Sequence, residues 1–147
     1  MIGILNNEAL GLLAIQFVLT KSPRLNIANA YLVTPLLFDK KIRGYLKRKT
    51  TNVLSVQEVV TANNDYFVGF NEKFTDSLVV STNAIAMGLE LNLFNLESGD
   101  LIDSASVSFD KRGLGSKLDD ILDASKNVSI MLSEPPASLY ALLRIEV

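Results

Sequence analysis

The sequence predicts an α+β fold that is mostly helical, with a winged-helix-like C-terminal half. Three observations predict this fold. Apolar residues recur at helical spacing through most of the first 90 positions. A stretch with apolar residues at alternate positions, 91–103, is interrupted by Ser98-Gly99-Asp100, which indicates a β-hairpin. A further helix and a terminal strand are expected after it, so the hairpin would form the wing of a winged helix.

A helix is expected near the N-terminus, capped by Asn6 or Asn7 and running through Leu19. It is apolar almost all round, because Leu12, Ile15 and Leu19 extend its main apolar face. Such a helix is either buried in its own domain or covered by a partner. We expect Leu12, Ile15 and Leu19 to form a protein interface, and the alternative is a fully buried central helix.

A second helix is expected from Ile27 to about Lys49, with Asn26 as its cap. Pro35 lies inside it. Proline lacks a backbone N–H and clashes with the preceding turn, so Pro35 should kink this helix or mark a break in it.

Two more helices are expected before the hairpin. Ser55 followed three residues later by Glu58 is a capping box for a short helix over 56–62. A longer helix should follow, from position 66 or 71 to 91. The longer helix is rich in Ser, Thr and Asn, which are poor helix formers, so tertiary packing must stabilise it.

The apolar alternation of the hairpin continues over 104–109, and a helix is expected over about 116–132. Pro135-Pro136 should end that helix. The final stretch, 139–147, is predicted to be a β-strand.

The 147 residues are expected to form one domain, 1–147, since no internal repeat or linker divides them. We distinguish a helical half, about 1–65, from the winged-helix-like half, about 66–147. The composition, 48% hydrophobic and 20% charged, excludes the intrinsically disordered class.

The chain contains no cysteine and no histidine. It therefore lacks any thiolate nucleophile, and it lacks the commonest general base and metal ligand. Asp119, Asp120 and Asp123 lie close together on a predicted helix and could bind Mg²⁺. Acids are favoured early in a helix in any case, so a solvated face is the simpler interpretation. We expect no enzyme activity, no catalytic residue, no metal site and no cofactor.

The apolar N-terminal run is not expected to be a signal peptide or a membrane span. No basic region precedes it, Glu8 interrupts it, and it is too short to cross a bilayer. We expect a cytoplasmic protein that makes no membrane contact.

Six of the 14 basic residues fall within ten positions, with no acid among them. They are Lys40, Lys41, Arg43, Lys47, Arg48 and Lys49. Three interpretations stay open: a solvated helix face, contact with nucleic-acid phosphates, or contact with an acidic protein partner.

Four segments, NNEALGLLAIQFV, YLVTPLLFDKKIR, AIAMGLELNLFNLESGDL and SLYALLRIEV, carry a family resemblance. In order and spacing they resemble the middle component of bacterial three-component ABC systems, a group that includes the Lamassu-type antiphage systems. The resemblance implies a non-catalytic accessory or bridging subunit. Its partners would be an SMC- or Rad50-like ABC ATPase and an effector subunit, with DNA contacted through the complex.

The alternative function is a free-standing winged-helix regulator that binds DNA. Such a regulator places one helix in the major groove, and that helix normally carries several Arg, Lys, Asn or Gln side chains. The helix before the predicted hairpin has Lys73 as its one basic residue and carries Glu72, Asp76 and Glu90. The sequence therefore disfavours the regulator.

Overall fold

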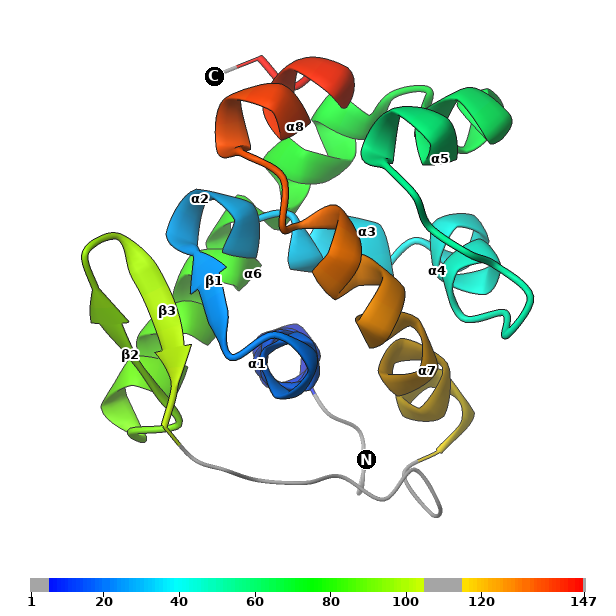
Figure 1. The fold of residues 1–147 in the computed structure, drawn as a ribbon. Helices are drawn as coiled ribbons and strands as arrows, with labels where there is room; N and C mark the ends of the chain where they lie inside the picture. The colour runs from blue at the N-terminus through cyan, green and yellow to red at the C-terminus, as the bar shows by residue number, and fades with distance from the viewer. Residues whose placement is uncertain (1–5, 105–114, 147) are drawn as a thin grey trace.

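The computed structural model describes residues 6–104 and 115–146, and they form a mostly helical fold with one small antiparallel sheet (Figure 1). The elements are α1 (Asn7–Lys21), β1 (Arg24–Asn26), α2 (Ile27–Ala30), α3 (Val33–Leu37), α4 (Lys40–Leu46), α5 (Val56–Ala62), the 3-10 turn η1 (Asn64–Phe67), α6 (Phe70–Glu90), β2 (Phe94–Glu97), β3 (Asp100–Asp103), α7 (Ser116–Met131) and α8 (Pro136–Leu142). The prediction of a mostly helical α+β fold is confirmed.

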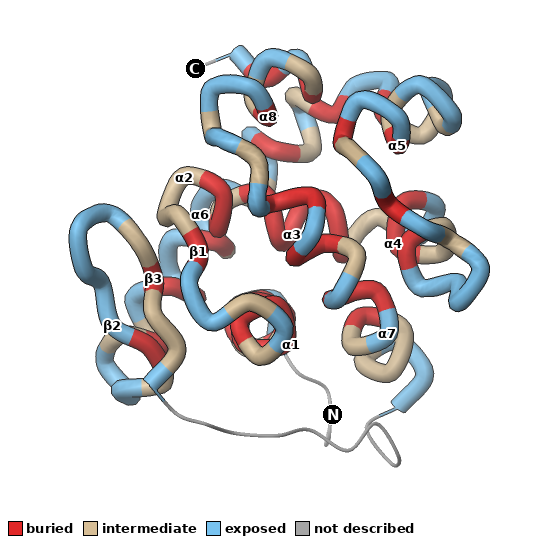
Figure 2. Tube along the Cα trace, in the orientation of Figure 1, coloured by how far each residue is buried: buried red, intermediate tan, exposed pale blue. Residues whose placement is uncertain are grey.

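The N-terminal helix is confirmed, and it lies at the centre of the fold. The side chain of Asn6 caps it by accepting a hydrogen bond from the Ala9 N–H at 2.8 Å. α1 packs against both α6 and α7, and burial along it is nearly continuous (Figures 1 and 2). The expectation that Leu12, Ile15 and Leu19 form an exposed apolar interface is wrong, because these side chains are only 7%, 0% and 0% exposed. α1 is the buried central helix of the alternative interpretation.

The predicted long helix over 27–49 is three short helices, α2, α3 and α4. Pro35 is the third residue of α3, in the first turn, where a helix does not use the backbone N–H. The breaks therefore lie on either side of α3 and not at the proline itself. The predicted cap is confirmed, since the Asn26 side chain accepts a hydrogen bond from the Ala28 N–H at 2.8 Å.

The predicted hairpin is confirmed as β2 and β3, with Ser98 and Gly99 at its turn. Both turn residues have positive φ, 51° and 81°, as a two-residue hairpin turn of the primed type requires. A third strand, β1, was not predicted. It pairs antiparallel with β3, and the described strands lie in the order β1-β3-β2, with β2 at an edge.

Phe94 holds the hairpin against α6. Its buried ring lies directly on Gly88, where a Cβ would overlap three ring atoms. A glycine at position 88 is therefore required by packing, because any side chain there would displace the ring and, with it, strand β2.

The predicted helix over 116–132 is confirmed as α7, but the predicted terminal strand over 139–147 is wrong. Leu139 and the residues up to Leu142 belong to α8. Pro136 occupies the first helical position of α8, where its fixed φ favours a helix. Pro135-Pro136 thus separates two helices. The alternation predicted over 104–109 lies, beyond Ser104, outside the described residues.

Buried polar contacts tie the C-terminal segment to α2. Asn29 Nδ2 donates to the carbonyls of Leu132 and Glu134, at 3.1 and 2.9 Å. The hydroxyl of Tyr140 donates to the Ala28 carbonyl at 2.5 Å. Burial and the nearby Tyr31 raise the pKa of Tyr140 to about 12, so the donating proton is retained at neutral pH.

We predict opposite effects for alanine at two helical glycines. Gly88→Ala should lower the free energy of unfolding by about 1–3 kcal/mol, because the added methyl overlaps the Phe94 ring. Gly44→Ala, in α4, should raise it by up to about 1 kcal/mol, because a Cβ there meets no atom within 4 Å. Urea unfolding followed by circular dichroism measures both. A Gly88→Ala variant as stable as the parent would contradict the packing described above.

Candidate functional site

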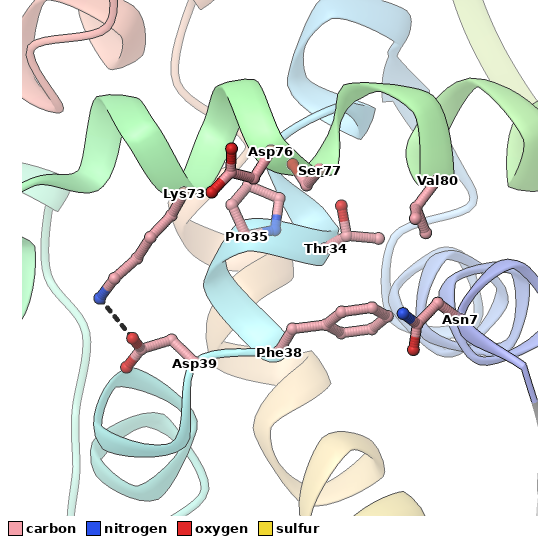
Figure 3. Close-up of a pocket in the computed structure, with 9 residues that line it drawn as sticks. All are labelled: Asn7, Thr34, Pro35, Phe38, Asp39, Lys73, Asp76, Ser77 and Val80. Carbon is pink, nitrogen blue, oxygen red and sulfur yellow. Dashed lines mark hydrogen bonds and ion pairs between the residues drawn. The ribbon is translucent and has the colours of Figure 1, made fainter.

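A half-open pocket of about 310 Å³ lies between α3, α6 and the start of α1 (Figure 3). Pockets of this size are at the small end of those that hold ligands. It has polar and apolar walls, which are lined by Asn7, Thr34, Pro35, Phe38, Asp39, Lys73, Asp76, Ser77 and Val80.

Asp39 joins two elements at the edge of this pocket. One carboxylate oxygen caps α4 by accepting from the Ile42 N–H at 2.9 Å, and the other accepts from Lys73 Nζ on α6 (Figure 3). Burial raises the pKa of Asp39, but the Lys73 ammonium and the Ile42 N–H lower it by more. The pKa therefore lies below its ordinary value of 3.8.

The other polar groups around the pocket divide between internal contacts and solvent. Thr34 and Ser81 share a buried hydroxyl hydrogen bond of 2.5 Å, and Ser77 donates to the Phe74 carbonyl at 2.8 Å. Asp76 is exposed and has no partner among the described residues. With its apolar wall from Pro35 and its free carboxylate, the pocket suits a polar or cationic side chain of a partner.

The six basic residues of the sequence cluster separate into three groups. Lys40 and Lys41 are exposed in the first turn of α4, where a cation gains nothing from the helix dipole. Arg43 is buried, and its guanidinium donates to the carbonyls of Leu37 and Phe38 at 2.9 and 3.3 Å. Arg43 therefore closes the C-terminal end of α3 and is not available to a partner.

The third basic group, Lys47, Arg48 and Lys49, is exposed beyond the other end of α4. It lines a hollow against α7 together with Lys126, which we call the α4–α7 hollow. Lys47 forms an ion pair with Asp120 of α7 at 3.1 Å. Lys126 was not anticipated, because it lies far along the sequence and only the packing of α7 on α4 brings it to the cluster.

Nearly the whole chain is similar to one protein family. Residues 8–147 match the model described as ABC-three component (ABC-3C) system Middle Component 3. The chain belongs to this Middle Component 3 family. The resemblance inferred from the sequence is thus confirmed at the level of the middle component, and membership implies partner components.

No curated protein and no solved structure is found to match the Middle Component 3 chain. The winged-helix-like arrangement of its C-terminal half therefore stays a prediction, as does the Lamassu-type assignment.

The three neighbouring aspartates of this Middle Component 3 chain do not form one site. Asp120 pairs with Lys47, Asp123 borders the α4–α7 hollow, and Asp119 has a buried oxygen that accepts no hydrogen bond from the described residues. Within residues 6–104 and 115–146, no group of three acidic side chains could hold a metal ion.

None of the helices described in those residues is long and apolar enough to cross a membrane.

We predict that Asp39 makes stability depend on pH. The pKa of Asp39 is lower in the folded chain than in the unfolded chain. Its contribution to stability is therefore complete above the unfolded pKa, near 4, and declines as pH falls through the folded pKa. Asp39→Asn keeps a capping side chain but loses the ion pair, at a cost of about 1 kcal/mol or less at neutral pH, since Lys73 is partly exposed. Urea unfolding between neutral pH and about pH 3 should show this cost shrinking with acid.

Lys73→Met is the control, because it removes the cation and leaves the cap in place. Adding Asp39→Asn to Lys73→Met should then change stability little at any pH. A difference between the parent and Asp39→Asn that stays constant down to about pH 3 would show that the charge of Asp39 is not what stabilises the fold.

Proposed function

We propose that this chain is a non-catalytic bridging subunit of a cytoplasmic antiphage complex. It would connect an SMC- or Rad50-like ABC ATPase to an effector subunit, in a Lamassu-type system that acts on DNA. The observation that carries the proposal is the match of residues 8–147 to a middle component of ABC-three component systems, since such a component works with partners.

Two exposed surfaces of opposite charge support a bridging role. The α4–α7 hollow is basic, with Lys47, Arg48, Lys49 and Lys126 around it. The hairpin surface, which we define as Glu90, Leu91, Leu96 and Glu97, is acidic and partly apolar. Leu91 and Leu96 are 60% and 47% exposed there, and β2 is an edge strand of the sheet as far as the described residues show it. Exposed apolar side chains beside a free strand edge are typical of a contact surface.

The two surfaces lie on opposite sides of the molecule, with the hairpin on one side of α1 and α4 on the other (Figure 1). Two partners could therefore bind at once without competing for the same surface. A basic or extended segment suits the hairpin surface, and an acidic partner or nucleic acid suits the α4–α7 hollow.

The proposal that the chain is not an enzyme rests on its side chains. It has no histidine or cysteine. In the pocket of Figure 3, Lys73 is held by Asp39, and the hydroxyls of Thr34 and Ser77 are engaged in internal hydrogen bonds. The polar groups of the pocket thus stabilise the packing of α3, α4 and α6 around it.

A free-standing winged-helix regulator is the alternative, because α6 leads directly into the hairpin. The side chains of α6 argue against it. Lys73, its one basic residue, is engaged by Asp39, while Glu72, Asp76 and Glu90 are exposed. The exposed acidic side chains of α6 would be repelled by the phosphates of DNA.

Co-purification tests the bridging role directly. We expect tagged chain, recovered from its native host, to bring down both a large coiled-coil ABC ATPase and an effector, as identified by mass spectrometry. A monomer or homodimer recovered alone would reject the bridging role and favour the regulator.

We predict that Lys47→Ala, Arg48→Ala and Lys49→Ala together weaken phage protection in a plaque assay while folding is retained. All three side chains are exposed, and the Lys47–Asp120 pair contributes about 1 kcal/mol or less. Lys40→Ala with Lys41→Ala, at the other end of α4, is the control and should protect as well as the parent. Undiminished protection by the triple variant would argue against a role for this basic group.

A further inference from the structure

The α4–α7 hollow has more positive charge than the sequence cluster alone indicates. It occupies about 490 Å³ and its described lining includes four basic side chains and one acid, Asp123. The described residues that line it are Lys47, Arg48, Lys49, Thr51, Asn52, Asp123, Lys126, Asn127 and Ile130. The fourth cation, Lys126, comes from α7 and lines the same hollow.

Three of the four cations are available to a ligand. Lys47 is held by Asp120 at 3.1 Å. Arg48, Lys49 and Lys126 are exposed, and among the described residues none of them has an acidic partner. Three cations around one hollow repel one another, and an anion between them would relieve that repulsion.

The frame that carries these cations is fixed by hydrogen bonds. Asn127 Nδ2 donates to the Leu46 carbonyl at 2.8 Å and to the Thr51 carbonyl at 3.4 Å, which joins α7 to the end of α4 and to the segment 47–51 that follows it. Thr51 donates through its hydroxyl to the Tyr45 carbonyl at 2.7 Å and through its N–H to the Arg48 carbonyl at 3.1 Å. Because the segment 47–51 is held in place before a ligand arrives, binding loses little conformational entropy.

The chemistry of the lining favours phosphates over an acidic protein. Among the described residues of the α4–α7 hollow there is no aromatic side chain, and Ile130, which is 38% exposed, is the one large apolar side chain. Protein interfaces are depleted in lysine at their centres and enriched in aromatic residues. Single-stranded nucleic acids are usually held by aromatic stacking, and none of the described residues of this hollow provides it. What remains is contact with the backbone of a duplex, without reading of bases.

We propose that Arg48, Lys49 and Lys126 bind the phosphate backbone of a nucleic-acid duplex in the α4–α7 hollow, independently of its sequence. This deepens the proposed function, because it names what the basic side of the bridging subunit contacts. Each neutralised phosphate contributes about −0.9 to the slope of log K against log salt concentration, so three contacts give about −2.7.

The test is fluorescence anisotropy of a labelled DNA duplex with the purified full chain, between about 50 and 200 mM salt. We expect binding with the slope given above, and the same behaviour with two DNA duplexes of unrelated sequence. An RNA duplex in a parallel arm distinguishes the two sources of the same backbone chemistry. Binding to either duplex, stronger than to single-stranded DNA, supports the proposal.

Arg48→Ala, Lys49→Ala and Lys126→Ala combined should lower affinity at least tenfold and remove most of the salt dependence. The matched control removes three exposed cations elsewhere, Lys21, Lys40 and Lys41, by the same substitution, so that net charge is equal in both variants. The control should bind like the parent. Urea unfolding of both variants confirms that each is folded.

Three results would overturn the proposal: equal loss of affinity in the control, competition by polyglutamate as effective as that by unlabelled duplex, or no binding of duplex by the parent chain. The last result leaves the bridging role intact, since co-purification tests that separately. Conversely, duplex binding by a chain that recovers no ATPase would reject the bridging role and leave the α4–α7 hollow as a phosphate site.

Discussion

The rest of the structure depends on the burial of α1. This helix has apolar side chains on every side, so it is stable only when other elements surround it. α6, α7, α3 and the sheet provide that cover (Figures 1 and 2). Even its polar Gln16 is used internally, donating to Asp103 of β3 at 3.0 Å. Because most of the central helix is enclosed, surfaces for partners are offered mainly by the elements around it.

Those outer elements offer two surfaces of opposite character. On one side the hairpin, fixed on α6 by the Phe94–Gly88 contact, carries exposed acids and leucines. On the other side α4 and α7, joined by Asn127 and the Lys47–Asp120 pair, carry exposed cations. The first connects to α1 through α6 and the second through α7, and both helices pack directly on α1. In the proposed bridging role, a small chain of this kind would hold two partners at a set distance and orientation.

The sequence predicted the elements whose signals are local. Apolar spacing predicted α1, α6 and α7, the Ser55 capping box predicted α5, and Ser98-Gly99 predicted the hairpin turn. The failures lie where tertiary contacts decide. β1 has three residues and forms because β3 lies beside it, and the apolar alternation after Leu139 fits a strand as well as the helix that Pro136 begins. Lys126 joins the basic group only through the packing of α7 on α4, and α1 is buried by elements far along the chain.

The pairing of β1 with β3 also has a consequence for synthesis of the chain on the ribosome. Arg24 meets Ile102 and Asn29 bonds to Leu132, so parts of the first third of the chain find partners in the last third. Until α7 has emerged, α1 is an apolar helix without its full cover. During synthesis α1 therefore emerges well before the last helix that covers it, and in that interval its apolar side chains are open to chaperones and to aggregation.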